Sequence, residues 1–300
     1  MIRVRVPASS ANMGAGFDTL GVALGLHSRL EVEEIPEGLE ISTLNAKGYV
    51  PHDGSNLIYK AMIKLFNHVG YTPRGIRIRQ DSLIPMTRGL GSSSACIIGG
   101  MLAANVISGR KLKHNEILNL AAEMEGHPDN AAAALYGGFC VAMSEGKTIY
   151  TRSTKLNSEL KFAVMIPDYF VATRKSRGVL PEKVDFKDAV FNISRAACFE
   201  SALINGDMEM LRHAVCDKLH QQYRKNYVDG FDEIVEKTYS IGSNATYLSG
   251  SGPPIVSILD KNYFEFNREM QRFFRDNAHE WTCMILSVDN VGAVVSEINQ

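Results

Sequence analysis

Apolar and polar residues alternate along three early segments of the chain, residues 2–6, 30–35 and 75–80. A period of two residues is typical of a β-strand with one buried face, so each segment is predicted to be a strand. Later strands are predicted at residues 162–166, 281–288 and 292–298, with a strand–glycine loop–strand unit across 246–258. The chain therefore carries strands in both of its halves.

Helical patterns lie between these strands. They predict helices from an N-cap at residues 55–56 to about 69, from about 93, at 115–125, from 130, and at 188–205, 207–224 and 262–276. Gly99 and Gly100 stand inside the second of these, where each costs about 1 kcal/mol against alanine. We expect that helix to lie at the centre of its domain, with another element packed close to the glycines. Strands and helices mixed in both halves predict an α+β fold.

Residues 147–160 are polar and lack periodicity, which predicts a domain boundary near Thr154 and two domains, 1–154 and 155–300. Of the 300 residues, 45% are hydrophobic and 22% charged, with a net charge of −1. Such a balance favours neither nucleic acid nor an acidic membrane as partner. No apolar run is long enough to span a bilayer and no secretion signal is present. Five scattered cysteines without a Cys-x-x-Cys motif indicate reduced thiols, and hence a cytoplasmic protein.

A glycine loop is the strongest chemical signal. Gly89 and Gly91 precede three serines, Ser92 to Ser94, at the predicted start of a helix. Backbone amides at a helix start form an anion site, commonly for phosphate. A tight turn into a buried helix explains the loop alone equally well. The loop lacks the Gly-Lys-Ser/Thr of Walker A, and Ser94 stands where a Rossmann fingerprint needs its third glycine.

Pro85 to Ser93 nevertheless match Pro-x-x-x-Gly-Leu-Gly-Ser-Ser at every specified position, and here the chain resembles the GHMP kinases. Three further segments resemble the homoserine kinase branch of that family, namely residues 7–18, 125–130 and 173–181. Residues 246–258 resemble the third motif of the GHMP family, which folds against the phosphate loop. Met13 and Ala15 replace the usual Leu and Pro of the first segment, and Ala133 replaces a common Pro. The resemblance extends over nearly the whole chain.

The resemblance implies an N-terminal βαβ-type ATP-binding domain and a C-terminal ferredoxin-like α/β sandwich. It implies ATP-dependent phosphorylation of the side-chain hydroxyl of L-homoserine with Mg²⁺ as cofactor, and leaves a homodimer open. Implied contacts to ATP are Asn56, Leu57, Pro85, Arg88, Gly89, Leu90, Gly91, Ser92, Ser93 and Ser94. Implied contacts to the substrate are Asn12, Asp18, His127, Asp129, Thr173, Arg177, Arg224 and Gly250.

Ser93 and Glu123 fall on the implied magnesium ligands, and Asp129 and Asn130 complete the implied catalytic group. Other interpretations stay open for single residues. Leu57 is as well explained as a core residue, a charged pair near a helix end is usually solvated, and His127 is more often an ordinary loop histidine than a catalyst.

No lysine or arginine lies between Arg5 and Arg29 to pair with an aspartate as a general base. We therefore expect direct phosphoryl transfer in which positioning makes the main contribution. Two other functions remain. A mevalonate-type kinase would not need Asp18 and Asp129 beside two arginines. A non-catalytic ligand sensor would be expected to have lost the magnesium pair.

Overall fold

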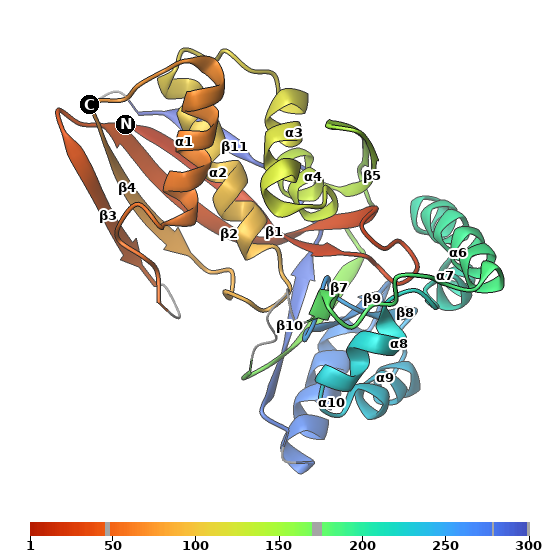
Figure 1. The fold of residues 1–300 in the computed structure, drawn as a ribbon. Coiled ribbons are helices and arrows are strands. Elements are labelled where there is room, and N and C mark those ends of the chain that lie inside the picture. Colours follow the sequence, from red (N-terminus) through yellow and green to blue (C-terminus); the bar gives the residue numbers. More distant parts are fainter. Residues whose placement is uncertain (46–48, 170–175, 278, 299–300) are drawn as a thin grey trace.

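The computed structural model describes residues 1–45, 49–169, 176–277 and 279–298, and within them two β-sheets with helices packed on each (Figure 1). The first sheet has the strand order β11-β1-β2-β4-β3, and β5 and β6 extend it from β2. Its strands are β1 (Ile2–Ala11), β2 (Leu20–Glu34), β3 (Gly38–Leu44), β4 (Gly75–Ser82), β5 (Phe139–Glu145), β6 (Thr148–Thr154) and β11 (Val294–Glu297). The predicted α+β fold is confirmed.

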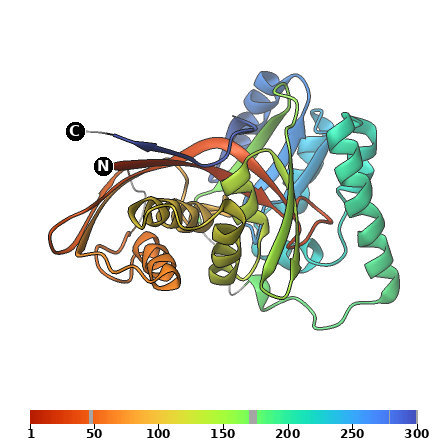
Figure 2. The same ribbon diagram turned by 90° about the horizontal axis from the view of Figure 1, so that it is seen from above.

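Four helices cover one face of this sheet (Figure 2). They are α1 (Leu57–Val69), α2 (Ser92–Ile107), α3 (His114–Glu125) and α4 (Asp129–Tyr136). Helix α2 is central, as its glycines predict. A Cβ added to Gly99 would lie 2.4 Å from the Leu30 side chain, and one added to Gly100 would lie 2.5 Å from the Ile58 carbonyl oxygen. The two glycines thus let α2 approach both the sheet and α1.

The second sheet is antiparallel throughout, with the order β10-β7-β9-β8. Its strands are β7 (Lys161–Pro167), β8 (Ala245–Leu248), β9 (Ile255–Leu259) and β10 (Trp281–Ser287). Helices α9 (Phe231–Ser240) and α10 (Tyr263–Asp276) pack on it through a small core that includes Met165, Phe266 and Phe274. Helices α6 (Phe186–Asn205) and α7 (Met208–Ala214) project at the outer edge of the molecule (Figure 1).

Two predictions about elements were wrong. The closing strand β11 belongs to the first sheet, because Ile2 to Arg5 of β1 pair antiparallel with Val294 to Glu297. The single helix expected at residues 207–224 is broken into α7 and the short α8 (Gln221–Arg224), which η1 (Lys225–Tyr227) follows. Asp217 causes the break, since its carboxylate accepts hydrogen bonds from the amides of Leu219, His220 and Gln221.

The first sheet is left after Thr154 and the second begins at Lys161, while β11 returns to the first sheet. The domain boundary at Thr154 therefore stays a proposal. It marks the passage from the first sheet to the second, but the two parts of the chain are not independent, because the C-terminal strand β11 belongs to the first sheet. None of the described helices combines the length and the apolar character needed to cross a bilayer.

Candidate active site

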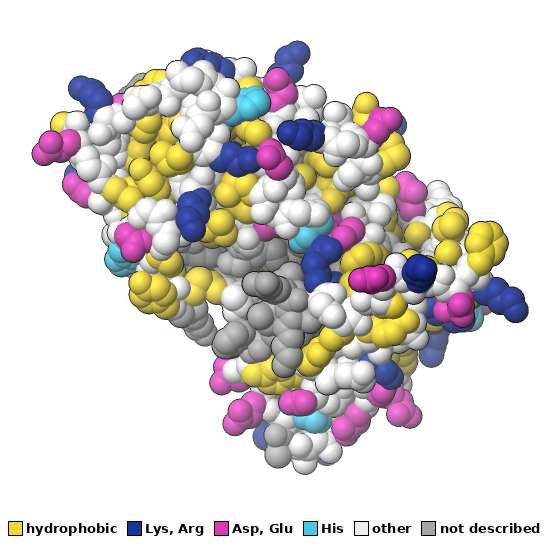
Figure 3. All heavy atoms as spheres, in the orientation of Figure 1, with side chains coloured by type: hydrophobic (Ala, Val, Ile, Leu, Met, Phe, Trp, Pro, Cys, Tyr) yellow, Lys and Arg dark blue, Asp and Glu magenta, His cyan; other side chains and the backbone are white. Residues whose placement is uncertain are grey.

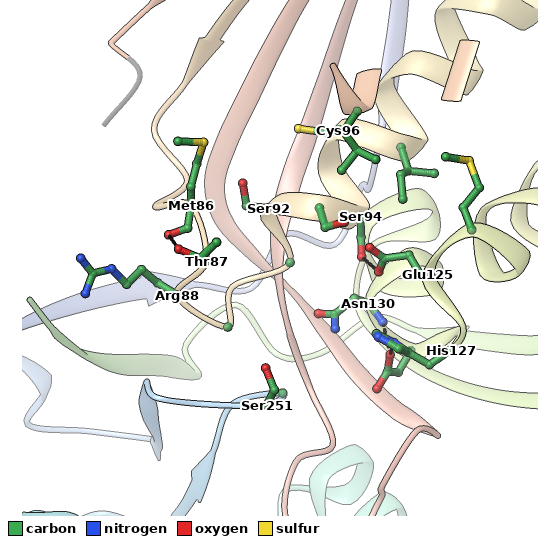
Figure 4. A pocket seen from close by; sticks show the side chains of 18 of the residues that line it. Met86, Thr87, Arg88, Ser92, Ser94, Cys96, Glu125, His127, Asn130 and Ser251 are labelled. Carbon is green, nitrogen blue, oxygen red and sulfur yellow. Dashed lines mark hydrogen bonds and ion pairs between the residues drawn. The ribbon is translucent and has the colours of Figure 1, made fainter. Parts of the chain in front are cut away.

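A cavity of about 520 Å³ opens between the two sheets and their helices. Most of its lining comes from five segments far apart in sequence, those around residues 12–18, 49–58, 86–97, 124–130 and 250–252, together with Arg177 and Arg224. Figure 4 shows the glycine loop with Arg88 on one side of the cavity and Glu125, His127 and Asn130 on the other. The site thus combines groups from both halves of the chain.

The glycine loop presents free backbone amides to this cavity. Gly91 is the N-cap of α2 with a left-handed φ of 66°, and no side chain caps the helix. The first intrahelical bond runs from the Ala95 amide to the Gly91 carbonyl oxygen, at 2.9 Å. The amides of Ser92, Ser93 and Ser94 are therefore left for a ligand, and helix α2 adds its positive dipole end. This arrangement suits a phosphate group.

Two neighbouring segments hold the loop in place. The hydroxyl of Ser249 donates to the Gly89 carbonyl oxygen at 2.7 Å, and the Ser9 amide donates to the Leu90 carbonyl oxygen at 3.1 Å. Ser10 and Ser249 are themselves joined by a 2.7 Å hydrogen bond between hydroxyls. The loop after β8 thus packs against the phosphate loop, as the resemblance implies.

The structure places Glu123, the predicted magnesium carboxylate, outside the cavity. Glu123 is half exposed and forms a 3.1 Å salt bridge with Lys64, away from the cavity. Glu125 instead lines the cavity and accepts a hydrogen bond from the Ser94 hydroxyl (Figure 4). Residues two apart on a helix face different directions, so only one of the two glutamates can reach the glycine loop. That residue is Glu125.

The cavity offers oxygen ligands that fit a magnesium ion. Glu125 supplies a carboxylate and the exposed Ser93, at the start of α2, supplies a hydroxyl. Mg²⁺ prefers such hard donors, and one or two from the protein are enough because the ion keeps waters and phosphate oxygens in its shell. The buried Ser94 is already bonded to Glu125 and is placed to orient the carboxylate.

One side of the cavity is acidic. Asp129 is buried at the start of α4, where its Oδ1 lies 2.6 Å from Nδ1 of His127 and accepts the Asn130 amide at 2.8 Å. Burial lowers the pKa of His127, but the hydrogen bond and the charge of Asp129 outweigh it and raise the pKa overall. Asp18 lies close by, with ligand atoms of Asp18, His127 and Asp129 within 4.8 Å of one another.

Two arginines face this acidic side from the second half of the chain. Arg177 binds both carboxylate oxygens of Asp18, at 2.7 and 3.1 Å. Arg224 is buried, and its guanidinium donates to the carbonyl oxygens of Gly250 at 3.0 Å and Ser176 at 3.3 Å. Burial, and then the charge of Arg177, lowers the pKa of Arg224 to about 10, so Arg224 remains a cation near neutral pH.

A buried histidine connects Arg224 with the first loop. Nε2 of His220 lies 2.8 Å from the Gly14 carbonyl oxygen, and its Nδ1 lies 3.4 Å from Nη1 of Arg224. Gly14 offers only an acceptor and Arg224 only a donor, so the ring is the neutral tautomer with its proton on Nε2. Burial lowers the pKa of His220, which agrees with a neutral ring. Phe17 stacks on it, with ring centroids 5.2 Å apart.

Other predicted residues divide into three groups. Asn56 and Leu57 line the cavity, and Asn56 also caps α1 by accepting the amides of Ile58 and Tyr59. Arg88 lines the cavity too, although its Nη1 donates to the Pro167 carbonyl oxygen at 2.5 Å.

Pro85 and Leu90 do not line the cavity, and the buried Leu90 belongs to the core. Thr173 lies outside the described residues. Residues of the cavity that the sequence did not single out include Tyr49, Gln80, Met86, Thr87, Cys96 and Ser251.

Comparison with known proteins shows the family of this chain. Residues 56–138 match the family model of the GHMP kinase N-terminal domain. The chain is 47% identical to a homoserine kinase of Caldicellulosiruptor saccharolyticus, over 99% of this chain and 97% of the relative. The crystal structure of homoserine kinase from Cytophaga hutchinsonii superposes with a TM-score of 0.87 at 25% identity, covering 98% of this chain and 97% of that one. A putative homoserine kinase from Listeria monocytogenes gives 0.84 at 27% identity, over the full length of both chains. The chain therefore belongs to the homoserine kinase family of GHMP kinases.

Proposed function

We propose that this enzyme transfers the γ-phosphoryl group of ATP to the side-chain hydroxyl of L-homoserine, the step that yields O-phospho-L-homoserine for threonine biosynthesis. The observation that carries the proposal is the charge layout of one cavity. A phosphate-binding helix start and Glu125 lie beside carboxylates of Asp18 and Asp129, and cationic Arg177 and Arg224 lie opposite them. An amino acid with a hydroxyl at the end of its side chain matches all three features.

ATP is held by this chain through the glycine loop. The amides of Ser92 to Ser94 bind phosphate oxygens, and Asn56 and Leu57 border the part of the cavity that receives the base. Glu125 and Ser93 would hold a magnesium ion, which would supply charge neutralisation for the phosphates. Ser94 holds the Glu125 carboxylate in position. The glycine loop thus does the binding and aligning that phosphoryl transfer requires.

The charged groups of the amino acid form ion pairs with oppositely charged side chains of the protein. Its carboxylate is taken by the guanidinium groups of Arg177 and Arg224, whose planar fork matches a carboxylate. Its ammonium is taken by Asp18 and Asp129, with Asn12 and Gly250 closing the pocket. Asp18 and Arg177 form an ion pair with each other in the structure. When the amino acid binds, this one ion pair is replaced by two, one between Asp18 and the substrate ammonium and one between Arg177 and the substrate carboxylate.

Among the described residues of the cavity, none is placed as a strong general base. Asp129 is held by His127 and by the Asn130 amide, so both its position and its charge are already engaged. Positioning of the hydroxyl against the γ-phosphoryl group therefore remains the main contribution of the protein to the rate. Asn130, which accepts the Ser9 hydroxyl at 2.9 Å, ties this wall of the cavity to the end of β1.

A coupled assay of ADP release over homoserine, mevalonate and galactose tests the proposal. Turnover with homoserine alone supports it. Preference for mevalonate would mean a mevalonate-type kinase, which the opposed charges of this cavity disfavour. Binding of a ligand without turnover, at saturating magnesium, would mean a sensor. The sequence leaves a homodimer open, and neither nucleic acid nor a membrane is expected as partner.

A further inference from the structure

Three buried hydroxyl groups form a chain of hydrogen bonds that ends on the glycine loop. Ser10, Tyr247 and Ser249 are completely buried, and none of them lines the cavity. The Ser10 hydroxyl oxygen lies 3.2 Å from that of Tyr247 and 2.7 Å from that of Ser249. The Ser249 hydroxyl lies 2.7 Å from the Gly89 carbonyl oxygen. The chain thus starts on β8 of the second sheet, passes through β1 of the first sheet and ends in the glycine loop.

The donors and acceptors of this chain have only one possible order. A carbonyl oxygen can only accept, so the single hydroxyl proton of Ser249 points to Gly89. Ser249 therefore accepts from Ser10, whose only proton is then used, and Ser10 in turn accepts from Tyr247. Burial raises the pKa of the Tyr247 phenol, so Tyr247 keeps its proton near neutral pH. Tyr247 is therefore the first donor of the chain.

The carbonyl groups of Gly89 and Leu90 help to set the shape of the glycine loop. Gly89 accepts the Ser249 hydroxyl, and Leu90 accepts the Ser9 amide at 3.1 Å. The C=O and N–H of a trans peptide point in opposite directions, so fixing these carbonyls also fixes the amides of Leu90 and Gly91. The approach is close, since a Cβ added to Gly89 would lie 2.7 Å from the Ser249 carbonyl oxygen.

We propose that Tyr247 is a positioning residue for the phosphates of ATP, which acts through Ser10 and Ser249 on the glycine loop. The inference rests on the proposed function only in that the glycine loop binds ATP. Hydrogen bonds in a chain strengthen one another, so the phenol at its start strengthens the bond to Gly89 at its end. In the face drawn in Figure 3, Lys and Arg side chains are interspersed with Asp and Glu. The described residues of this face therefore form no basic patch that would hold the phosphates in place of the loop.

The amino-acid end of the cavity is held by different hydrogen bonds. Asn12 donates to the Gly250 carbonyl oxygen at 2.7 Å, and Arg224 donates to the same oxygen at 3.0 Å. Neither bond includes a hydroxyl of the chain. Removal of the Tyr247 hydroxyl should therefore weaken the binding of ATP and leave the binding of homoserine nearly unchanged.

Tyr247→Phe tests the proposal, because it keeps the buried ring and removes only the hydroxyl. The probe is a non-hydrolysable ATP analogue with magnesium, and its Kd is measured by calorimetry on the full chain. We expect this Kd to rise about two- to tenfold, the range for one hydrogen bond between uncharged groups. The Kd of homoserine and the melting temperature should stay nearly unchanged.

Tyr239→Phe is the matched control. Tyr239 lies half-buried on α9, and its hydroxyl accepts the amide of Thr246, the residue before Tyr247, at 3.2 Å. This variant also loses one hydrogen bond of a tyrosine hydroxyl to β8, but that bond does not lead to the glycine loop. The Kd of the ATP analogue should therefore stay at the wild-type value.

The order of the chain gives a second test. Ser10→Ala should raise the Kd of the ATP analogue more than Tyr247→Phe does, because it leaves the Ser249 hydroxyl without its donor. Adding Tyr247→Phe to Ser10→Ala should raise that Kd no further, since the chain is already broken at Ser10. The two substitutions are thus expected to be non-additive, as for groups of one network.

Four outcomes would overturn the proposal. They are an unchanged Kd of the ATP analogue in Tyr247→Phe, an equal rise in Tyr239→Phe, additive effects of the Ser10 and Tyr247 substitutions, and a rise in the Kd of both ligands with a lower melting temperature. The last would mean a purely structural role. A wild type that binds the analogue without phosphorylating homoserine would contradict the proposed function alone, and the Kd values of the variants would still decide the inference.

Discussion

Glu125 and Glu123 stand two positions apart at the end of α3 and meet different surroundings. Glu125 reaches the cavity and the Ser94 hydroxyl, whereas Glu123 pairs with Lys64 in solvent. We expect Glu125→Gln to lower kcat by at least about a hundredfold, because removing a group that holds transition-state charge costs roughly 2.7–4 kcal/mol. The measurement is steady-state kinetics with magnesium titrated to saturation.

Glu123→Gln is the matched control, with the same change of charge two residues away. It should keep nearly full activity, since Glu123 lies outside the cavity in a solvent-exposed ion pair with Lys64, and such pairs contribute little. Equal losses of activity in the two variants would contradict the assignment of Glu125 as the magnesium ligand, and a loss only in Glu123→Gln would favour Glu123 instead. The sequence could place a carboxylate near the end of this helix. It could not say which of the two faces the cavity, since that depends on the rotation of α3 against α2.

His220 is expected to position Arg224 and not to touch the substrate. Replacement of the ring should raise KM for homoserine about tenfold, since a hydrogen bond to a charged group is worth roughly 1.5–3 kcal/mol. The KM for ATP should not change. His220→Asn, which can keep an acceptor near Nη1 of Arg224, should be milder than His220→Gln, which can keep only the bond to Gly14.

A purely structural role for His220 would give a different result. Both variants would then lose thermal stability in proportion to their loss of activity, and the KM values of ATP and homoserine would rise together. Melting temperatures measured beside the kinetics separate the two cases. The neighbours of His220, Gly14 and Phe17, lie about two hundred residues away in the chain, so no local pattern could show this contact.

At the scale of elements, the junction of the glycine loop and α2 depends on a missing side chain. A Cβ at Gly91 would lie 2.0 Å from the Ser9 hydroxyl oxygen, so the loop or β1 must move to accept one. We expect Gly91→Ala to lose most activity and to raise KM for ATP, because the amides of Ser92 to Ser94 are then displaced. Kinetics and a melting curve measure the two effects.

Gly70→Ala controls for backbone strain. Gly70 has the same φ of 66° at the end of α1, but a Cβ there meets nothing within 4 Å. It should cost about 1–2 kcal/mol of stability, the usual penalty of a left-handed residue with a side chain, and leave KM for ATP unchanged. A similar rise of KM in both variants would mean that strain, and not contact with Ser9, controls the loop.

Local patterns predicted the elements that have one buried face. Helices α1 and α3 and strand β4 have the expected type and nearly the expected bounds, because their periodicity matches their burial. Strand β1 runs on to Ala11 through residues buried on both sides, where alternation disappears and the sequence resembled a loop. Strands β3, β5 and β6 and helix α9 were not predicted. The pairing of β11 with β1 joins the two ends of the chain, and only tertiary packing decides it.

The whole molecule brings together charges that the sequence keeps far apart. Asp18 and Asp129 come from the first half of the chain and Arg177 and Arg224 from the second, and a 2.7 Å contact between Asp18 and Arg177 shows that the two groups meet in one cavity. These residues were assigned from the sequence through family resemblance. Their spacing along the chain alone could not have shown that they lie in one site, because tertiary packing brings them together. What the sequence did not show is that the acid and the arginine bind each other before substrate enters.

If the substrate bridges the two halves of the chain, its carboxylate and its ammonium group should be recognised independently of each other. Two analogues test this, homoserine with its carboxylate replaced by hydrogen and homoserine with its amino group replaced by hydrogen. Wild type should discriminate against each by at least tenfold in kcat/KM, because each leaves buried or paired charges without a partner. Arg224→Ala should lose discrimination against the first analogue and keep it against the second, while Asp129→Asn should do the reverse. Arg224→Lys should behave like Arg224→Ala, since an ammonium cannot reproduce the planar fork that donates to Gly250 and to a carboxylate at once. If both variants lose discrimination against both analogues, the two ends are not read separately, and the substrate does not span the cavity in the proposed direction.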